Sequence, residues 1–449
     1  MHKPKAVEYF LFAAFLILYV FIGYKVSRHE TVPLLTAYFV AFALYLFLAL
    51  LRPRDKSVDF WFYGSIVLRA LFLFSIPNLS DDFYRFIWDG RLLASGIHPF
   101  AHVPVYYIDN NVPIQGIDED LFNNLNSAKY FTIYPALSQI VFWLAASLSP
   151  NNVYGSVVVI KLVMFASEIG SLLLLRNLIN NFNLPPARVL LYALNPLVII
   201  ELVGNAHLEA MMIFFVLLTL VFLNSNREFL SAVVYAAAIC VKIIPLIFLP
   251  VIIQRLGWSR AWKFCMIACI SGLVMFIPLF DLKIISGYYQ SIGYYFSRFE
   301  FNASLYYIVR WLGWIIFGFN IIQYAGIILA GVALIAIIRI ANHAKQPSSS
   351  SSTVDQHFVA RLMLVQLIYL LFTTTVHPWY ITMLLMLAVL TEFRFAVIWT
   401  AMIFLTYAGY TVDTFRENLW LTSIEYIVVL GYLVFEITWE RKYLRLQQR

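Results

Sequence analysis

Long apolar runs recur along the chain, and they constrain its fold more than any other feature of the sequence. A helix needs about 20 apolar residues to cross the hydrocarbon core of a bilayer, because each residue rises about 1.5 Å. Every backbone polar group must also be hydrogen-bonded within such a segment. Candidate spans lie near residues 7–24, 31–51, 60–77, 132–148, 155–175, 187–203, 208–223, 229–253, 264–280, 321–340, 361–375, 379–391, 395–410 and 421–438. The pattern predicts an all-α, polytopic membrane protein with about 12 to 14 transmembrane helices.

The overall composition agrees with a membrane fold and excludes several other classes of protein. Hydrophobic residues make up 62% of the 449 residues and charged residues only 12%, whereas about a quarter of a soluble domain is charged. A soluble fold with this balance would expose large apolar patches and aggregate. We interpret the net charge of +7 as anchoring of cytoplasmic loops and expect no nucleic-acid partner.

Lysine and arginine side chains gather in short loops, and this bias predicts which side of the membrane each loop faces. The basic residues that mark the cytoplasmic face are Lys3, Lys5, Arg52, Arg54, Lys56, Arg255, Arg260, Lys263, Arg441, Lys442, Arg445 and Arg449. Both termini are therefore expected inside, in a single integral membrane domain over 1–449. The polar segments 78–131 and 281–303 are expected outside, on the same face, and the serine-rich segment 341–358 is expected to be a flexible cytoplasmic linker.

The middle of the chain leaves the direction of the crossings open. Counting every candidate span as a full crossing places Arg176 and Arg188 outside. Kinked or half-spanning helices between 187 and 253 would change that assignment. Both alternatives are compatible with the sequence.

The first polar segment begins with two adjacent carboxylates, Asp81 and Asp82. Two negative charges close to a bilayer are costly unless something offsets them. A general base for an acceptor hydroxyl, or a contact to a divalent cation, would explain the pair. The alternative is structural, because Ser80 and the two aspartates ahead of an amphipathic helix also form an ordinary helix start. Asp82, Arg85 and Asp89 fall at positions i, i+3 and i+7, so they can share one helix face.

The run from Asp81 to Phe100 contains Asp-Asp-Phe-Tyr-Arg-Phe-Ile-Trp-Asp-Gly-Arg and, after four residues, Gly-Ile-His-Pro-Phe. This run resembles the first-loop signature of GT-C membrane glycosyltransferases, in particular the polyprenol-phosphate-mannose-dependent mannosyltransferases. His98 and Phe100 stand where that signature usually has Asn and Tyr. The resemblance continues at Ile133-Tyr134-Pro135, Lys242-Ile243-Ile244-Pro245, Phe299-Glu300-Phe301-Asn302 and His377-Pro378-Trp379-Tyr380. Two helices precede the usual start of the GT-C layout.

The resemblance implies a GT-C-like fold with a long extracytoplasmic first catalytic loop that carries interfacial helices. It also implies that Asp81 or Asp82 acts as the base for the acceptor hydroxyl, or contacts a metal ion or the acceptor. Whether a divalent cation such as Mg²⁺ or Mn²⁺ takes part stays open, and Asp81 and Asp82 would be its ligands. The implied donor is a hexose, in particular mannose, joined to a polyprenyl phosphate.

A departing lipid phosphate carries negative charge, so positive side chains should lie near it. The candidates are Arg85, Arg91, Lys242, Arg298 and His377. Asp89, Asn302 and Tyr380 lie in the same motifs and complete the substrate-binding candidates.

Two of the cationic candidates also have a structural interpretation. Lys242 lies in an apolar run, where a charge is costly, but a lysine at a helix end can also reach back to the membrane interface. His377 stands beside Trp379 and Tyr380, which fit an aromatic belt as well as a phosphate contact.

Further ionisable groups lie within the apolar segments. Glu201, His207 and Glu209 surround a Gly-Asn break, which indicates a cavity lining or a helix turn that faces water. Glu168 is expected to have a buried polar partner, with Lys161 as the candidate.

The segment 281–303 is rich in aromatic residues: Tyr288, Tyr289, Tyr294, Tyr295, Phe296, Phe299 and Phe301. Aromatic faces stack on sugar rings, and they also anchor proteins at the membrane interface. Their expected position, on the same face as Asp81, favours a substrate vestibule.

The leading interpretation is a glycosyltransferase of the bacterial inner membrane whose active site faces outside. It would transfer a hexose from a polyprenyl-phosphate donor to a hydroxyl of a glycan, glycolipid or protein, by direct displacement with inversion. A transporter or flippase of a lipid-linked sugar is the alternative, because helix breaks at Pro245 and Gly204-Asn205 are typical of transporters. A third interpretation, a non-catalytic membrane subunit, would leave Asp81 and Asp82 replaceable.

Overall fold

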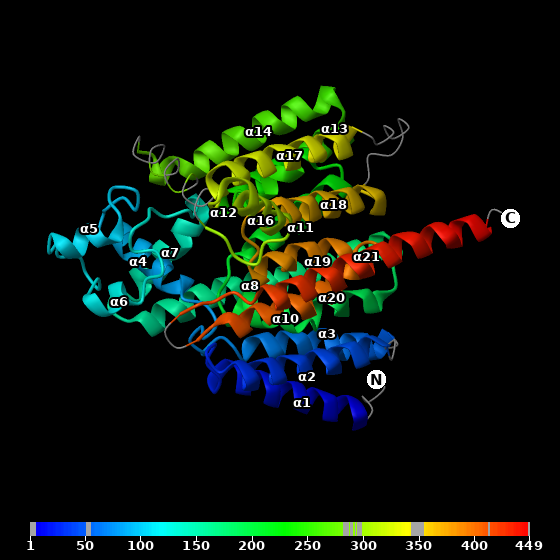
Figure 1. Ribbon diagram of the computed structural model, residues 1–449, viewed down its shortest axis with the longest axis horizontal. Coiled ribbons are helices and arrows are strands. Elements are labelled where there is room, and N and C mark those ends of the chain that lie inside the picture. Colours follow the sequence, from blue (N-terminus) through cyan, green and yellow to red (C-terminus); the bar gives the residue numbers. More distant parts are fainter. Residues whose placement is uncertain are drawn as a thin grey trace.

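The computed structural model describes residues 6–50, 55–281, 287, 291, 293, 299–342, 354–411 and 414–447. These residues form a bundle of helices, and the only extended pairings among them are two isolated bridges, Phe301 with Thr375 and Tyr410 with Phe415. The start of α1 (Ala6–Tyr24) and the end of α21 (Leu419–Gln447) lie at one end of the bundle. The short helices α5 (Pro104–Asp109) and α6 (Glu119–Asn123) lie at the opposite end, called the site end below (Figure 1).

Six described helices are long and apolar enough to cross a membrane, and the count is seven if a bent pair is taken as one span. They are α1, α2 (Thr31–Leu50), α8 (Val153–Asn181), α14 (Trp258–Phe276) with its 3-10 extension η4 (Ile277–Leu279), α17 (Ile322–Asn342) and α21. With 29 residues, α8 is about 44 Å long and exceeds the thickness of the hydrocarbon core. These helices confirm the prediction of an all-α, polytopic membrane protein.

The described residues also form shorter apolar helices of 10–17 residues, and all of them except the one at Leu305–Phe317 correspond to predicted spans. They are α7 (Ala136–Leu148), α11 (Glu209–Asn224), α12 (Glu228–Val241), η3 (Ile244–Phe248) with α13 (Leu249–Leu256), α16 (Leu305–Phe317), α18 (Gln356–Phe372), η5 (Pro378–Tyr380) with α19 (Ile381–Val389), and α20 (Phe395–Met402) with η6 (Ile403–Gly409). Pro245, Pro250 and Pro378 stand in the first turns of η3, α13 and η5. A proline fits there because the first turn of a helix leaves its N–H groups unpaired in any case.

The helix α7 explains why the direction of the middle crossings is ambiguous in the sequence. Its 13 residues span about 20 Å, which is too short for a full crossing. It packs against α4 (Asp82–Ala94) at the site end (Figure 1), so counting 132–148 as a full crossing is wrong.

The position of Arg176 changes accordingly. Near the end of α8, its guanidinium pairs with Asp59, which lies in the first turns of α3 (Asp55–Ala70), at 2.7 Å. The residues just before α3 belong to the basic cluster that the charge bias assigns to the cytoplasm. Arg176 therefore lies with the expected cytoplasmic loops and not on the opposite side.

A bent pair of helices follows α8. The first half, η1 (Pro186–Val189) with α9 (Leu190–Ala193), meets the second half, α10 (Pro196–Val198) with the π-helix η2 (Ile199–Gly204), at an angle of 51°. At the break, the Asn195 side chain accepts hydrogen bonds from the backbone N–H groups of Leu197 and Val198. This cap stabilises the start of the second half, and the kink is one of the two alternatives that the sequence leaves open.

A buried ion pair joins α3 to α8. Arg69 Nε donates to Glu168 Oε2 at 3.0 Å, and both side chains are fully buried. The predicted pairing of Glu168 with Lys161 is therefore wrong. Lys161 Nζ instead donates to the carbonyls of Phe72 and Ser75. These carbonyls follow the last turn of α3, where a helix leaves its C=O groups without partners.

The close packing of α4 on α7 depends on Gly90. A Cβ atom at this position would lie 2.1 Å from the backbone oxygen of Phe142 in α7. Only glycine permits such an approach, which brings the Arg85–Asp89 face of α4 against α7.

Candidate active site

A cavity of about 470 Å³ lies at the site end, where loops from distant parts of the chain meet. Its walls come from the α1–α2 loop, the start of α4, the segment before α7, the end of α12, and the loops that precede α16, η5 and α21. The sequence-predicted candidates that line it are Asp81, Asp82, Arg85, Lys242, His377 and Tyr380. Enzymes often place their reactive groups on loops of a rigid scaffold, so this cavity is the candidate active site.

The two aspartates do not act as helix caps. Asp81 occupies the N-cap position of α4, but its side chain makes no capping hydrogen bond. Its Oδ2 instead accepts from Arg28 Nη2 at 2.5 Å. Asp82 Oδ1 accepts from Asn126 Nδ2 at 2.9 Å. Both carboxylates therefore belong to the cavity wall, and the structural interpretation of the Ser-Asp-Asp start does not explain their contacts.

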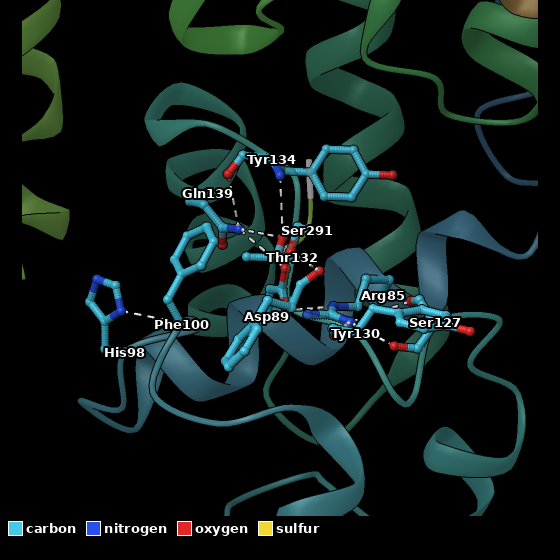
Figure 2. Close-up of polar contacts among 11 residues, drawn as sticks. Arg85, Asp89, His98, Phe100, Ser127, Tyr130, Thr132, Tyr134, Gln139 and Ser291 are labelled. Atoms are coloured by element: carbon cyan, nitrogen blue, oxygen red, sulfur yellow. Dashed lines mark hydrogen bonds and ion pairs between the residues drawn. The ribbon is translucent and has the colours of Figure 1, made fainter. Parts of the chain in front are cut away.

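A buried polar network behind the cavity orients Arg85. Arg85 Nε donates to Asp89 Oδ1 at 2.8 Å, and Asp89 is fully buried. Gln139 of α7 donates to the other oxygen of Asp89 at 3.1 Å and to Thr132 Oγ1 at 3.1 Å (Figure 2). Arg85 Nη1 also donates to the carbonyl of Tyr130. The network fixes the guanidinium at the cavity wall, so Asp89 supports the site without lining it.

One nitrogen of this guanidinium has no hydrogen-bond partner within the part of the chain that the structure describes. Arg85 Nη2 is buried, and no hydrogen-bond acceptor among the described residues reaches it. An unpaired charged donor is costly to bury. An anion in the cavity would supply the missing acceptor.

Lys242 lies at the point where α12 ends, as the C-cap residue. Its ammonium pairs with Glu209 of α11 and lies 4.9 Å from the centre of the Tyr380 ring. The Glu209 side chain is 1% exposed, so this pair is held between protein elements and does not reach back to the membrane interface.

A second cavity, of about 500 Å³, adjoins the first one. Its lining is almost entirely apolar and comes from η3 and α13 on one side and from α17 and α18 on the other. Ile133, Tyr134, Lys242 and Tyr380 line both cavities. The cavity with the aspartates therefore meets an apolar groove, and Lys242 stands at their junction.

Aromatic rings surround His377. Its ring stacks on Trp379 with centroids 4.5 Å apart and lies 4.6 Å from Phe301. Phe301 is held there by backbone hydrogen bonds to residues 374 and 376. Burial, with smaller effects from the nearby charges of Lys242 and His207, lowers the pKa of His377 from 6.5 to about 3. A neutral ring can accept or donate a hydrogen bond, but it does not supply the positive charge expected of it from the sequence.

Other sequence-predicted candidates lie outside the cavity lining. Arg91 is buried behind α4, where it donates to the carbonyl of Gly116. Asn302 donates to both oxygens of the buried Glu425 of α21. Arg298 and the aromatic residues Tyr288, Tyr289, Tyr294, Tyr295 and Phe296 lie outside the described residues, whereas Phe299 and Phe301 line the cavity.

The ionisable residues near the Gly-Asn break, Glu201, His207 and Glu209, do not form one cluster but make two separate contacts. His207 Nε2 lies 3.3 Å from Glu201 Oε2, and Glu201 also accepts from Tyr407 at 2.6 Å. Glu209 turns instead to Lys242. Neither of the two large cavities is lined by Glu201, His207 or Glu209.

Two residues of the cavity wall escaped the sequence analysis. Arg28 reaches the site from the α1–α2 loop and Asn126 from the segment between α6 and α7. In a sequence, a lone arginine beside an apolar helix is most simply interpreted as an anchor at the membrane interface. An asparagine in a polar loop does not by itself indicate a functional site. Only their contacts with Asp81 and Asp82 in the folded structure identify them as residues of the site.

The pair of aspartates offers little to a resident divalent cation. Asp81 is engaged by a guanidinium, and the described residues contain no group of three or more His, Cys, Asp or Glu side chains suited to a metal ion. Mg²⁺ and Mn²⁺ prefer several oxygen ligands. These residues therefore do not fit such a site, and the mechanism proposed below contains no metal-dependent step.

Comparison with known proteins gives the family of the chain. Residues 25–257 match the family described as alpha-(1->6)-mannopyranosyltransferase, N-terminal domain. The chain is also 25% identical over 229 residues to alpha-(1->6)-mannopyranosyltransferase A of Mycobacterium tuberculosis (strain ATCC 25618 / H37Rv). That match covers 48% of this chain and 42% of the relative, so the aligned part spans less than half of each protein.

The family match contains most of the candidate site. Arg28, Asp81, Asp82, Arg85 and Lys242 all fall between residues 25 and 257. The matched region also covers more than half of the sequence. This chain belongs to the alpha-(1->6)-mannopyranosyltransferase family, as a polytopic membrane protein of GT-C-like character.

Proposed function

We propose that this protein transfers a mannosyl group from a polyprenyl-phosphate donor to a hydroxyl of an acceptor glycan, glycolipid or protein. The family supports the sugar, since the matching family and the mycobacterial relative are both described as mannopyranosyltransferases. The class of donor rests on the cavities of this chain.

The observation that carries the proposal is the junction, at Lys242, of a cavity lined by charged side chains with an apolar groove. A polyprenyl-phosphate sugar has the same three parts in the same order: a polar sugar, an anionic phosphate and an apolar chain. The groove that η3 and α13 form with α17 and α18 would take the isoprenoid units, because burial of apolar surface is favourable at about 25 cal/mol per Å². The sugar would then lie in the cavity with Asp81 and Asp82.

Two cationic side chains, Lys242 and Arg85, would bind the phosphate that links the sugar to the isoprenoid chain. The Lys242 ammonium carries three N–H donors and stands at the junction. Arg85 Nη2 is a buried donor without a partner among the described residues. Positive groups placed where negative charge develops stabilise the leaving phosphate in the transition state.

The chemical step is a direct displacement at the anomeric carbon. The acceptor oxygen forms a bond to that carbon, and its proton passes to a carboxylate of the Asp81–Asp82 pair. The bond from the anomeric carbon to the phosphate oxygen breaks, and the phosphate leaves with the electron pair. Attack from the face opposite the phosphate inverts the configuration, so a β-linked donor gives an α-linked product.

The proposal also includes the location of the protein. The start of α4 and the segment before α7, which line the cavity, lie at the end of the bundle opposite the start of α1 and the end of α21 (Figure 1). The charge bias of the sequence assigns those two ends to the cytoplasm. The active site would then face the outside of a bacterial inner membrane, where the lipid donor enters the groove from the bilayer.

Transfer by the purified full-length protein tests this proposal. The protein in lipid nanodiscs is incubated with radiolabelled polyprenyl-phosphate mannose and octyl α-mannoside, and the product is separated and its anomeric configuration is determined by NMR. We expect an α-linked dimannoside from the wild type. We also expect loss of at least 100-fold in turnover when both aspartates are changed to Asn, since general-base catalysis contributes about 10²–10⁴-fold.

Arg176→Gln is the matched control, because it removes an ion pair of similar geometry at the opposite end of the bundle. A product with retained configuration would overturn the displacement step. Passage of the lipid-linked sugar across a liposome membrane without transfer would support the flippase instead, and full activity of the double Asn variant would exclude both aspartates as the base.

A further inference from the structure

The α1–α2 loop places Arg28 at the wall of the candidate active site. The loop is fastened to the segment that follows α3: Tyr24 donates to the carbonyl of Leu71 at 2.6 Å, and Asn78 Nδ2 donates to the carbonyl of Ile22 at 2.7 Å and to that of Val26. Arg28 therefore enters the cavity from a fixed loop.

Two groups in the cavity hold the Arg28 side chain. Its Nη2 donates to Asp81 Oδ2 at 2.5 Å, and its guanidinium carbon lies 5.1 Å from the centre of the Tyr410 ring. The side chains of Arg28 and Asp81 are 21% and 34% exposed, so water reaches the pair only in part. Partial burial strengthens the attraction between the charges relative to a pair on the open surface.

The neighbouring aspartate has a different partner. Asp82 Oδ1 accepts from the neutral amide of Asn126, and Asp82 Oδ2 has no hydrogen-bond partner among the described residues. A proton bound to Asp82 Oδ2 would leave the hydrogen bond from Asn126 intact. A proton bound to Asp81 would instead neutralise the partner of Arg28 and leave a guanidinium in the cavity without a counter-charge.

We propose that Asp81 stays ionised as the ion-pair partner of Arg28, so that Asp82 is the carboxylate that takes the proton of the acceptor hydroxyl. This inference rests on the proposed transferase function. In the displacement step, the acceptor oxygen bonds to the anomeric carbon, the phosphate leaves with its electron pair, and the acceptor proton moves to Asp82 Oδ2. Arg28 is a positioning residue, and the Arg28–Asp81 pair forms a wall of donors and acceptors against which the hydroxyls of the acceptor sugar bind.

A double-mutant cycle tests this division of roles, with kcat and the KM of each substrate measured for transfer from polyprenyl-phosphate mannose to octyl α-mannoside. Asp82→Asn should lower kcat by about 10²–10⁴-fold and leave both KM values within about threefold. Arg28→Gln and Asp81→Asn should each raise the KM of octyl α-mannoside and lower kcat by less than about tenfold. Because they form one unit, the variant with both changes should behave like the more affected single variant.

The comparison pair in the cycle is Arg28 with Asp82. No hydrogen bond or ion pair among the described residues joins these two side chains, so the effects of Arg28→Gln and Asp82→Asn on kcat/KM should multiply. Arg28→Lys should recover most of the activity lost in Arg28→Gln, because it keeps the charge. Arg176→Gln, which removes the ion pair with Asp59 at the other end of the bundle, should change neither kcat nor KM.

A loss of kcat in Asp81→Asn equal to or greater than that in Asp82→Asn would overturn the inference, and so would multiplicative effects of Arg28→Gln and Asp81→Asn. The same cycle is measured by thermal unfolding in detergent, which needs no activity. There Arg28→Gln and Asp81→Asn should be coupled, and Arg28→Gln and Asp82→Asn should be additive. A wild type that transfers no mannose overturns the proposed function, whereas absence of thermal coupling between Arg28 and Asp81 overturns the present inference on its own.

Discussion

The position of Lys242 at the junction of the two cavities makes its contribution to donor binding measurable. Lys242→Gln alone is a poor test, because the partner Glu209 is 1% exposed and would be left as a buried charge without a counter-charge. Breaking a buried pair in this way costs about 3–5 kcal/mol. The informative comparison is therefore between Glu209→Gln and the double variant Glu209→Gln/Lys242→Gln, in which no unpaired carboxylate remains.

The expected size of the effect follows from the contacts of the ammonium. Of its three N–H donors, one serves Glu209 and the ring of Tyr380 lies on another side, 4.9 Å away. At least one donor is left for a phosphate oxygen. A hydrogen bond to a charged group contributes about 1.5–3 kcal/mol, which corresponds to about 10- to 150-fold in affinity.

Binding of farnesyl phosphate and of farnesol, measured by isothermal titration calorimetry on protein in nanodiscs, separates the phosphate from the chain. Relative to Glu209→Gln, the double variant should bind farnesyl phosphate about 10- to 150-fold more weakly and farnesol equally well. An equal loss for both ligands would show that Lys242 shapes the groove and does not bind phosphate. No loss for either ligand would refute the assignment of Lys242 to the junction.

Three further predictions follow from single positions. Ala330→Trp places a large ring in the apolar groove, so it should weaken binding of a long-chain polyprenyl phosphate more than that of farnesyl phosphate, as competition binding would show. Gly90→Ala would bring a Cβ to 2.1 Å from a backbone oxygen of Phe142, and it should lower the midpoint of thermal unfolding by several degrees; an unchanged midpoint would contradict the packing of α4 on α7. Burial and the charge of Lys242 lower the pKa of His377 to about 3, so the unfolded chain binds a proton below about pH 6.5 that the folded protein does not. The stability that this difference contributes is fully present above pH 6.5 and is lost as the pH falls toward 3, and His377→Gln should lose less stability over that range than the wild type does.

The length of the apolar segments and the residue types in the motifs are the two features of the sequence that predict the fold class and the candidate site residues. The apolar runs predict a polytopic helical protein, and α1, α2, α8, α14, α17 and α21 confirm it. The motif residues Asp81, Asp82, Arg85, Lys242 and His377 come from three separate regions of the sequence, and the fold brings them to one cavity.

Other features depend on contacts between distant segments, which a single sequence does not encode visibly. Arg28 and Asp81 are 53 positions apart, and nothing in the residues around Arg28 marks it as a partner. The segment 132–148 is apolar enough to read as a span, but it stays short because Pro135 precedes α7 and because α7 packs on α4 instead of crossing. Glu168 pairs with Arg69 of α3, whereas Lys161, seven positions earlier in α8, donates to the carbonyls of Phe72 and Ser75.

Asp89 and Asn302 illustrate a different limit. Both lie in motifs, yet Asp89 is buried behind Arg85 and Asn302 is buried against Glu425. A motif marks residues that the site depends on, but it does not distinguish a side chain that faces the cavity from one that supports a neighbour.

The central claim is that one ligand occupies both cavities, with its phosphate at Lys242. An electron cryo-microscopy structure of the protein with a bound polyprenyl phosphate tests it most directly. We expect isoprenoid density along the groove that η3 and α13 form with α17 and α18, and a phosphate within about 3 Å of Lys242 Nζ, the usual length of a charge-assisted hydrogen bond. Density for the lipid elsewhere on the bundle, with the groove empty, would contradict it.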